Sequence, residues 1–366
     1  MTADPLRSVP DRRTCLAGMA ALFAGMSLRT PRAAPADPAA LDRVVADAGR
    51  LGNLNSLIIS QGGDTLVEQR FRGPGLDRGV NVKSISKTWI ATLTGIAIDR
   101  GALDGVDQPI APLLADRLPS DPDPRLAEVT IGHLLAMRAG LERTSGPFYG
   151  RWVTSPDWVR YALSRPFVDE PGGAMLYSTG NSHLLSAILT EVAGRSTRAS
   201  MRAWLGDPLD IAIPDWPRDP QGIYFGGNDM VLSPRALVRF GDMIRQGGVL
   251  DGRRIVPADW IERSWRPRTR SPYTGHAYGY GWFLAEARGY PVRYAWGYGG
   301  QMLYVVPGLA LTVAMTSDPT TPSGRTGYAR QLHDLLANGI IPAIAGGGTG
   351  PTAGDTPPSG AEPSGG

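Results

Sequence analysis

Residues 81–103 read NVKSISKTWIATLTGIAIDRGAL, and they carry a serine and a lysine three positions apart where a helical pattern begins. A helix starting near Ser84 places this serine and Lys87 on one face, so that hydroxyl and amine can touch. It also directs free backbone N–H groups at Ser84. Gly101 follows in the usual place beyond a helix end. The helix is predicted from apolar residues at spacings of three and four, namely Trp89, Ile90, Leu93, Ile96 and Ala97.

The pairing of serine with lysine has a chemical meaning. A serine hydroxyl is a weak nucleophile until a base takes its proton. A lysine held neutral by burial can be that base, whereas an arginine cannot, because it does not deprotonate. Of the 37 Lys and Arg residues only Lys83 and Lys87 are lysines. The pattern therefore favours a catalytic Ser84–Lys87 pair, with an ordinary surface pair on a helix as the alternative.

The first 36 residues have the layout of an export signal. Arg12-Arg13 precedes an apolar run from residue 16 to 28, which is followed by a small-residue stretch ending at Ala36. These are the three regions of a secretory signal peptide, and the paired arginines suggest the twin-arginine route. The run is too short to span a bilayer comfortably, so we expect an exported protein with no stable membrane span after processing. A short buried or membrane-associated helix is the alternative.

Charge and cysteine content exclude some partners. The formal net charge is +3, and cleavage after Ala36 would remove five arginines and two aspartates, leaving 3 − 3 = 0. We therefore predict no nucleic-acid partner from the basic pI. The single cysteine, Cys15, would leave with the leader, so the mature chain would have no disulfide.

Along the chain, strands are predicted at both ends and helices between them. Residues 38–49 should form a helix, and 57–60 and 65–71 a β-hairpin. Helical patterns at 129–137, 154–163, 180–192 and 233–244 come next. The period then falls to two in 280–285, 292–296, 302–306 and 309–315, before a closing helix at 327–336. We expect disorder in the Gly- and Pro-rich residues 345–366.

The predicted fold class is α/β in the α+β sense. An antiparallel sheet built from residues 37–105 and 275–344 would be flanked by helices, with an all-helical domain at 106–274 inserted between its two parts. The Ser84 helix would then lie at the junction of the two domains, where sites are common.

Two further stretches are candidates for the same site. Tyr177 lies just before a predicted helix, where the dipole favours an anion, so its phenolate can be a proton acceptor beside a lysine. A tyrosine that anchors a loop is the alternative. Residues 295–301 read AWGYGGQ, and such glycines weaken a strand unless a backbone or ligand approaches closely. An N–H group there can pair with the Ser84 N–H to bind an oxyanion, and a plain bulge is the alternative.

Together the order S-x-x-K, then Y-x-x, then a glycine-rich strand resembles the serine hydrolases related to class C β-lactamases and penicillin-binding proteins. The stretches 131–141, 226–234 and 299–307 are also similar to that family, so the resemblance covers roughly residues 40–340. The branch it most resembles contains esterases and 6-aminohexanoate-dimer hydrolases. The resemblance implies a β-lactamase/transpeptidase-like fold.

The resemblance also implies roles for individual residues. Ser84 would be the nucleophile, Lys87 and Tyr177 the proton-transfer pair, and the N–H groups of Ser84 and Gly300 the oxyanion hole. The family's Y-x-N asparagine is Thr179 here, and the lysine of its K-T-G motif is Gly297. The loss of that cation argues against β-lactams and acyl-D-alanine peptides as substrates. Residues expected to bind substrate are Thr179, Gly297, Tyr298 and Gly299.

The leading hypothesis is hydrolysis of a small-molecule ester or amide through an acyl-enzyme on Ser84. Two alternatives remain at this stage: a D-Ala-D-Ala carboxypeptidase or β-lactamase, and an exported, catalytically silent binding or sensing protein. No cofactor motif and no metal-ligand spacing is present. His133, His183, His276 and His333 are therefore predicted to be structural, and no cofactor or metal is expected.

Overall fold

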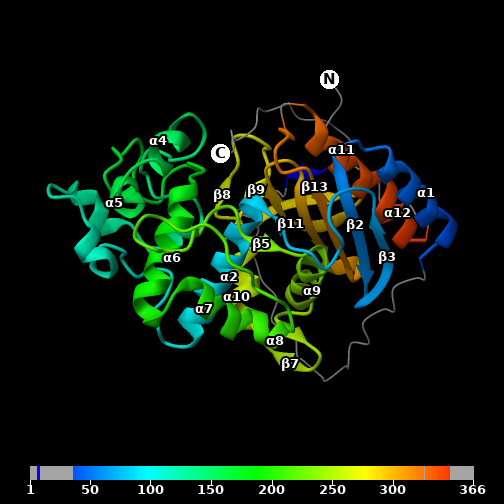
Figure 1. The fold of residues 1–366 in the computed structure, drawn as a ribbon, viewed down its shortest axis with the longest axis horizontal. Coiled ribbons are helices and arrows are strands. Elements are labelled where there is room, and N and C mark those ends of the chain that lie inside the picture. Colours follow the sequence, from blue (N-terminus) through cyan, green and yellow to red (C-terminus); the bar gives the residue numbers. More distant parts are fainter. Residues whose placement is uncertain (1–5, 9–35, 325, 347–366) are drawn as a thin grey trace, which may run out of the picture.

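The computed structural model describes residues 6–8, 36–324 and 326–346. A single antiparallel sheet runs through the right-hand half of the molecule in Figure 1, in the order β3-β2-β13-β12-β11-β10-β9-β8. Its strands come from both ends of the chain, as predicted. They are β2 (Leu54–Gln61), β3 (Asp64–Arg70), β8 (Thr269–Arg270), β9 (Ala277–Tyr278), β10 (Phe283–Ala287), β11 (Tyr290–Gly297), β12 (Gln301–Val306) and β13 (Leu311–Ser317).

Helices cover both faces of the sheet, because consecutive residues of its central strands are buried on both faces. In the pairing of β2 with β13, Ile58 lies opposite Ala314 and Ile59 opposite Val313, and the two pairs point to opposite faces. Ile59 and Val313 belong to a core shared with α1 (Pro38–Gly49), α11 (Tyr328–Asp334) and α12 (Ile341–Ile344). Ile58 and Ala314 belong to a second core shared with α2 (Ser86–Asp99) and α9 (Pro234–Arg245).

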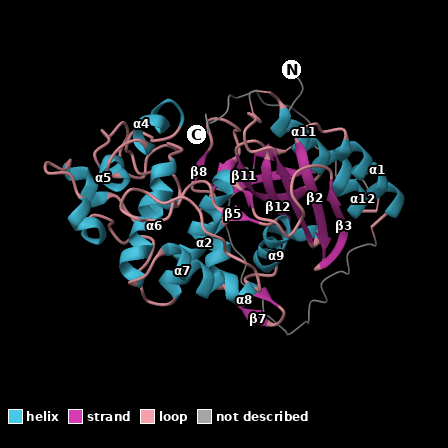
Figure 2. Cartoon of the chain, viewed as in Figure 1, coloured by secondary structure: helices cyan, strands magenta, loops and turns pink. Residues whose placement is uncertain are grey.

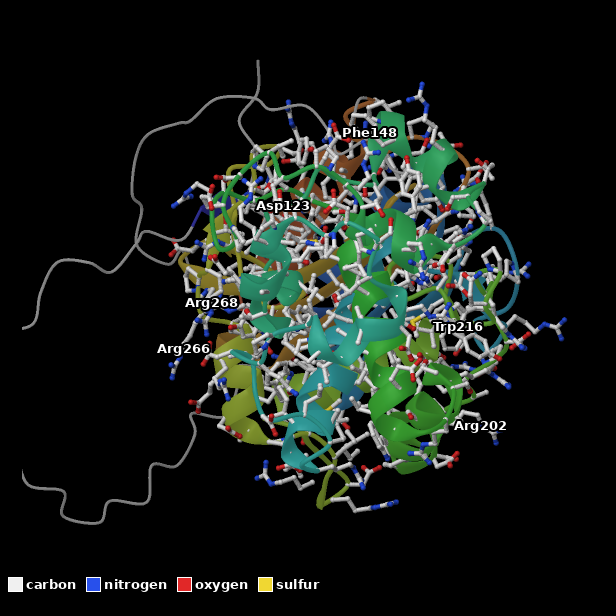
Figure 3. All side chains as sticks on the ribbon, turned by 90° about the vertical axis from the view of Figure 1, so that its left-hand side faces the viewer. Asp123, Phe148, Arg202, Trp216, Arg266 and Arg268 are labelled. Carbon is white, nitrogen blue, oxygen red and sulfur yellow. The ribbon has the colours of Figure 1, made fainter. Side chains whose placement is uncertain are left out.

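The second core extends without a break into a helical lobe, which lies to the left of the sheet in Figure 2. The lobe is built around α6 (Thr179–Ala193), which packs against α2, α3 and α5. Its other helices are α3 (Ile131–Leu135), α4 (Tyr149–Val153), α5 (Trp158–Leu163), α7 (Thr197–Met201), α8 (Asp207–Leu209) and α10 (Ala258–Ser264). Figure 3 views this end of the molecule, with Arg202 and Arg266 on opposite sides of its outline.

The fold class predicted from the sequence is confirmed, whereas the domain boundary at residue 274 stays a prediction. Helix α9, expected in the inserted domain, packs on β2, β12 and β13. The buried Asp242 on this helix accepts hydrogen bonds from Ser60 of β2 and Thr312 of β13, both at 2.8 Å. The helix therefore belongs to the sheet, and its amphipathic pattern alone did not say which partner its apolar face would meet.

The predicted terminal segments fall mostly outside the described residues. This holds for the expected leader, apart from residues 6–8 and 36, and for the expected tail from residue 347 onward. Within the leader, Leu6 is buried and β1 (Arg7–Ser8) pairs with β10. Part of the segment predicted as a leader thus contacts the sheet in the full-length chain. No helix in the described part of the chain has the length and apolar content needed to cross a membrane.

Candidate active site

The predicted nucleophile lies at a tight entry into helix α2. Strand β4 (Val80–Asn81) pairs with β5 (Val231–Leu232), and a 3-10 turn (Lys83–Ile85) then leads into α2. Lys83, the residue before Ser84, has a left-handed backbone with φ of 51°, which is strained for a residue with a side chain. Ser84 is partly exposed at this turn and accessible to a substrate.

A small polar network holds the strained turn in place. The backbone N–H of Lys83 donates to the Asn81 side-chain oxygen at 2.9 Å, and Asn81 Nδ2 donates to Asp229 at 2.7 Å. Lys83 Nζ forms an ion pair with the same Asp229 oxygen at 3.0 Å. Asp229 is also left-handed, with φ of 59°. The ion pair therefore joins two positions with left-handed backbones, one of which directly precedes Ser84.

Lys87 points back at Ser84 from the first turn of α2. Its Nζ lies 2.9 Å from Ser84 Oγ, 2.5 Å from the carbonyl oxygen of Gly227 and 3.3 Å from Thr179 Oγ1. A neutral amine has two N–H donors and one lone pair. An ammonium would donate to all three oxygens, whereas a neutral amine would donate to Gly227 and Thr179 and accept from the Ser84 hydroxyl. The predicted Ser84–Lys87 contact is thus present in the structure.

The surroundings of Lys87 favour its neutral form. The residue is only 3% exposed, and desolvation by burial lowers the pKa of its amine from 10.5 to about 7. The charge of Asp229 opposes this shift, but Asp229 is shared with Lys83 and Asn81. No carboxylate lies within salt-bridge distance of Lys87 in the described part of the chain. At neutral pH a large fraction of Lys87 is therefore a free base.

Tyr177 completes the cluster from the helical lobe. Its hydroxyl lies close enough to the Ser84 side chain for Ser84 to lower its pKa, and Lys87 Nζ lies 5.0 Å from the centre of its ring. Burial is the main cause that raises the pKa of Tyr177 to about 12, although the Ser84 hydrogen bond lowers it. The predicted position is therefore found, but the predicted phenolate is not favoured. Desolvation raises the pKa of Tyr177 more than Ser84 lowers it, so Tyr177 is a neutral phenol at neutral pH.

Two adjacent glycines bring the Gly227 carbonyl to Lys87. A Cβ atom at Gly226 would lie 2.1 Å from the Ser182 carbonyl oxygen, and one at Gly227 would lie 2.6 Å from the Thr179 carbonyl oxygen. Only glycine lets this segment pass so close to the start of α6. The role of Gly227 was not predicted, although the stretch 226–234 resembles the family, because Lys87 is contacted by its backbone carbonyl and not by a side chain.

Thr179 supports the lysine and not, as expected, the substrate. It is 3% exposed, and its hydroxyl contacts Lys87 and also Ser145 Oγ at 2.8 Å. Its backbone N–H donates to the same Ser145 oxygen at 2.8 Å. The expectation that Thr179 binds substrate is corrected accordingly. The role of Ser145 was not predicted, since Ser145 lies 34 residues before Thr179 in the sequence and belongs to no motif.

The glycine-rich stretch at residues 295–301 lies beside the segment that carries the nucleophile, but its glycines have other roles than the expected ones. A Cβ atom at Gly297 would lie 2.4 Å from the Val82 carbonyl oxygen and 3.0 Å from Lys83 Cβ, so glycine is required for this contact. The Gly300 N–H donates to the Gly297 carbonyl oxygen at 3.1 Å and closes a turn. It is therefore not free to bind an oxyanion, which corrects the expectation for Gly300.

The neighbours of Gly297 differ in their access to the site. Gly299 is buried against the backbone of Asp318, which a Cβ atom would meet at 2.3 Å, and this corrects its expected contact with substrate. Tyr298 is half-buried, and its backbone N–H has no hydrogen-bond partner within residues 36–324 and 326–346. Gly297 packs against Val82 and Lys83, the two residues before Ser84. The next residue after Gly297 is Tyr298, so its unpaired backbone N–H is our candidate for the oxyanion hole.

The class of protein follows from the antiparallel sheet and the helical lobe beside it: this is a β-lactamase/transpeptidase-like fold. The sequence profile of the β-lactamase family matches residues 42–337, and the chain belongs to that family. A 6-aminohexanoate-dimer hydrolase from Paenarthrobacter ureafaciens is 25% identical over 297 residues, which are 71% of each chain.

Solved structures show the same fold at lower sequence identity. EstCE1, a hydrolase with promiscuous acyltransferase activity, superposes with a TM-score of 0.66 at 16% identity and covers 82% of this chain and 99% of its own. A D-stereospecific amidohydrolase from Streptomyces sp. gives a TM-score of 0.62 at 18% identity, covering 82% and 98%. The family and its relatives make the chain a β-lactamase-fold hydrolase with ester and amide hydrolases among its neighbours.

Because the chain has only two lysines, the charge of Lys87 can be measured directly. We expect one of the two ¹³Cε-lysine NMR resonances to titrate near pH 7, since burial lowers the pKa of Lys87 to about 7. The measurement is an NMR pH titration of protein labelled with [¹³Cε]lysine. The Lys87→Arg variant should lose that resonance and assign it. A resonance of Lys87 that titrates only near pH 10 would contradict the neutral amine.

Proposed function

We propose that this protein is a serine hydrolase that cleaves a carboxylic ester or amide through an acyl-enzyme on Ser84. The observation that carries the proposal is the buried Lys87 amine, 2.9 Å from Ser84 Oγ, with its two N–H groups matched by Gly227 and Thr179. A surface ion pair on a helix would be solvated and charged. This amine is desolvated, and in its neutral form it can accept the proton of the Ser84 hydroxyl.

In the first half of the reaction, Ser84 Oγ attacks the substrate carbonyl carbon and its proton moves to Lys87 Nζ. The tetrahedral oxyanion accepts hydrogen bonds from backbone N–H groups of Ser84 and, in our assignment, Tyr298. Collapse breaks the bond to the leaving group, which takes a proton from the Tyr177 hydroxyl. The Lys87 ammonium then returns a proton to Tyr177, so both groups are restored.

In the second half, water attacks the acyl carbon and gives its proton to Lys87. The bond from the acyl group to Ser84 Oγ breaks, the serine oxygen recovers a proton from Tyr177 or Lys87, and a carboxylic acid leaves. The raised pKa of Tyr177 suits this role, because a neutral phenol can donate a proton whereas a phenolate cannot. Each step is acid–base chemistry and requires no cofactor.

The substrate is proposed to be a small ester or amide and not a β-lactam or an acyl-D-alanine peptide. Gly297 replaces the family's strand lysine and is packed against Val82 and Lys83, so no cation is available at that position. The other nearby cation on that side, Lys83, is neutralised by Asp229. The position of Gly297 thus offers a substrate carboxylate no cation.

The Ser84→Ala variant tests the nucleophile. We expect it to lose hydrolysis of p-nitrophenyl butyrate by a factor of about 10⁴ or more and to lose labelling by a fluorophosphonate, because the acyl group has no oxygen to join. The matched control is Ser164→Ala on the exposed end of α5, which should keep both properties. Undiminished turnover or labelling in Ser84→Ala would overturn the assignment.

The Tyr177→Phe variant tests the proton donor through the leaving group. We expect kcat for ethyl butyrate to fall about 10²-fold or more, since an alkoxide needs a proton to leave. Turnover of p-nitrophenyl butyrate should fall much less, because p-nitrophenolate leaves unprotonated. The measurement is kcat for both esters in both proteins. Equal losses for the two esters would mean that Tyr177 does not act as the leaving-group acid.

A further inference from the structure

Arg143 lies in a loop that is fixed to the catalytic cluster on both sides. Leu141 forms an isolated β-bridge with Phe167, and the Glu142 N–H donates to the Pro166 carbonyl oxygen at 2.8 Å. On the other side, the Thr144 N–H donates to Ser178 Oγ at 3.0 Å. The backbone around Arg143 is thus anchored by regular contacts before and after it. Its position relative to the Tyr177–Thr179 segment is set by the fold.

The Arg143 side chain contacts a second tyrosine, Tyr273. Its Nη1 donates a hydrogen bond to the hydroxyl of Tyr273. Tyr273 packs against the apolar core that includes Tyr177, and the two tyrosines interact electrostatically. Both Arg143 and Tyr273 are half-buried and therefore remain accessible to a small molecule. Arg143 is thus tied to the surroundings of Tyr177 in two ways, through its hydrogen bond to Tyr273 and through the next residue, Thr144, which contacts Ser178.

The charge of Arg143 is not balanced within the site. Glu142, its neighbour in the chain, forms an ion pair with Arg165, and Lys83 forms one with Asp229. Arg143 has no carboxylate partner among the residues that the structure describes. Lys87 is largely neutral near pH 7. A half-buried guanidinium with an uncompensated charge beside a reaction centre is a binding site for an anion.

We propose that Arg143, positioned by Tyr273, binds a carboxylate on the leaving group of the substrate. This inference rests on the proposed function, because Tyr177 marks the leaving-group side only if it protonates the leaving atom. The substrate class is then an acyl ester or amide of a hydroxy acid or amino acid. The guanidinium suits this role, since one of its N–H groups is used by Tyr273 and the others can form a planar fork with a carboxylate.

In this proposal the β11 strand and the helical lobe differ in the charge that they offer to a substrate. The family's strand cation is absent because Gly297 is packed against the segment before Ser84, so the β11 side offers a carboxylate no charge. The helical-lobe side offers Arg143. A carboxylate that reaches Arg143 would hold the scissile carbonyl over Ser84 with the leaving atom near Tyr177. The substrate carboxylate is thereby recognised by the loop at residues 141–145, and not by a lysine on the strand as the family pattern implies.

The test uses two esters that differ only in one charge, 4-(butyryloxy)benzoate and its methyl ester. We expect wild-type protein to have a higher kcat/KM for the carboxylate, and Arg143→Gln to lower the ratio of the two values about tenfold or more, mainly through KM. Tyr273→Phe should lower the ratio less. The control Arg151→Gln removes the same charge from an exposed position on α4 and should leave the ratio unchanged. An unchanged ratio in Arg143→Gln would overturn the proposal.

A binding measurement distinguishes this proposal from the catalytic one. Calorimetry with Ser84→Ala and uncleaved 4-(butyryloxy)benzoate should show binding that the methyl ester lacks and that Ser84→Ala/Arg143→Gln loses. Equal binding of both esters would overturn the role of Arg143 whatever the turnover. If the carboxylate binds through Arg143 but neither ester is cleaved by wild-type protein, the anion site stands and the hydrolase assignment fails.

Discussion

The removal of Lys87 from water is the constraint on which the whole site depends. A lysine in water is charged at neutral pH and cannot accept a proton from serine. Here desolvation lowers the pKa of Lys87 to about 7, and three neighbours match the neutral amine. Those neighbours come from three distant segments, at residues 84, 179 and 227. The close contact of α2 with α6, and the glycines that let residues 226–227 pass beside α6, are therefore conditions for the chemistry.

Local sequence was enough to predict the parts of the site that are local. Ser84 and Lys87 meet because residues three apart share a helix face, and Tyr177 was found because it precedes a helix. Gly227 and Ser145 were missed because they act through a carbonyl and a buried hydroxyl without a motif. Tyr177 was expected to be a phenolate, since the sequence shows the helix but not the depth of burial. The sheet was predicted from alternation, whereas the partner of α9 depends on tertiary packing.

The glycine-rich stretch at residues 295–301 keeps the glycines of the family pattern but lacks its lysine, which is Gly297 here. Gly297 is required sterically by its contact with Val82, and the Gly300 N–H is used to close the turn that follows. What remains on this side is a backbone surface with the Tyr298 N–H and no cation. Arg143, hydrogen-bonded to Tyr273, is the group that we propose to take over the binding of a carboxylate. In this proposal the catalytic cluster and the substrate anchor come from different parts of the fold.

The central claim is that a desolvated, neutral Lys87 activates Ser84. The most direct measurement is the second-order rate of Ser84 modification by a fluorophosphonate as a function of pH. Since the base must lose its proton first, the logarithm of the rate should rise with a slope of one below about pH 7 and remain level above it. A rate that keeps rising to pH 10 would contradict the account, because the base would then be a group with an ordinary high pKa, either a solvated lysine or a phenol.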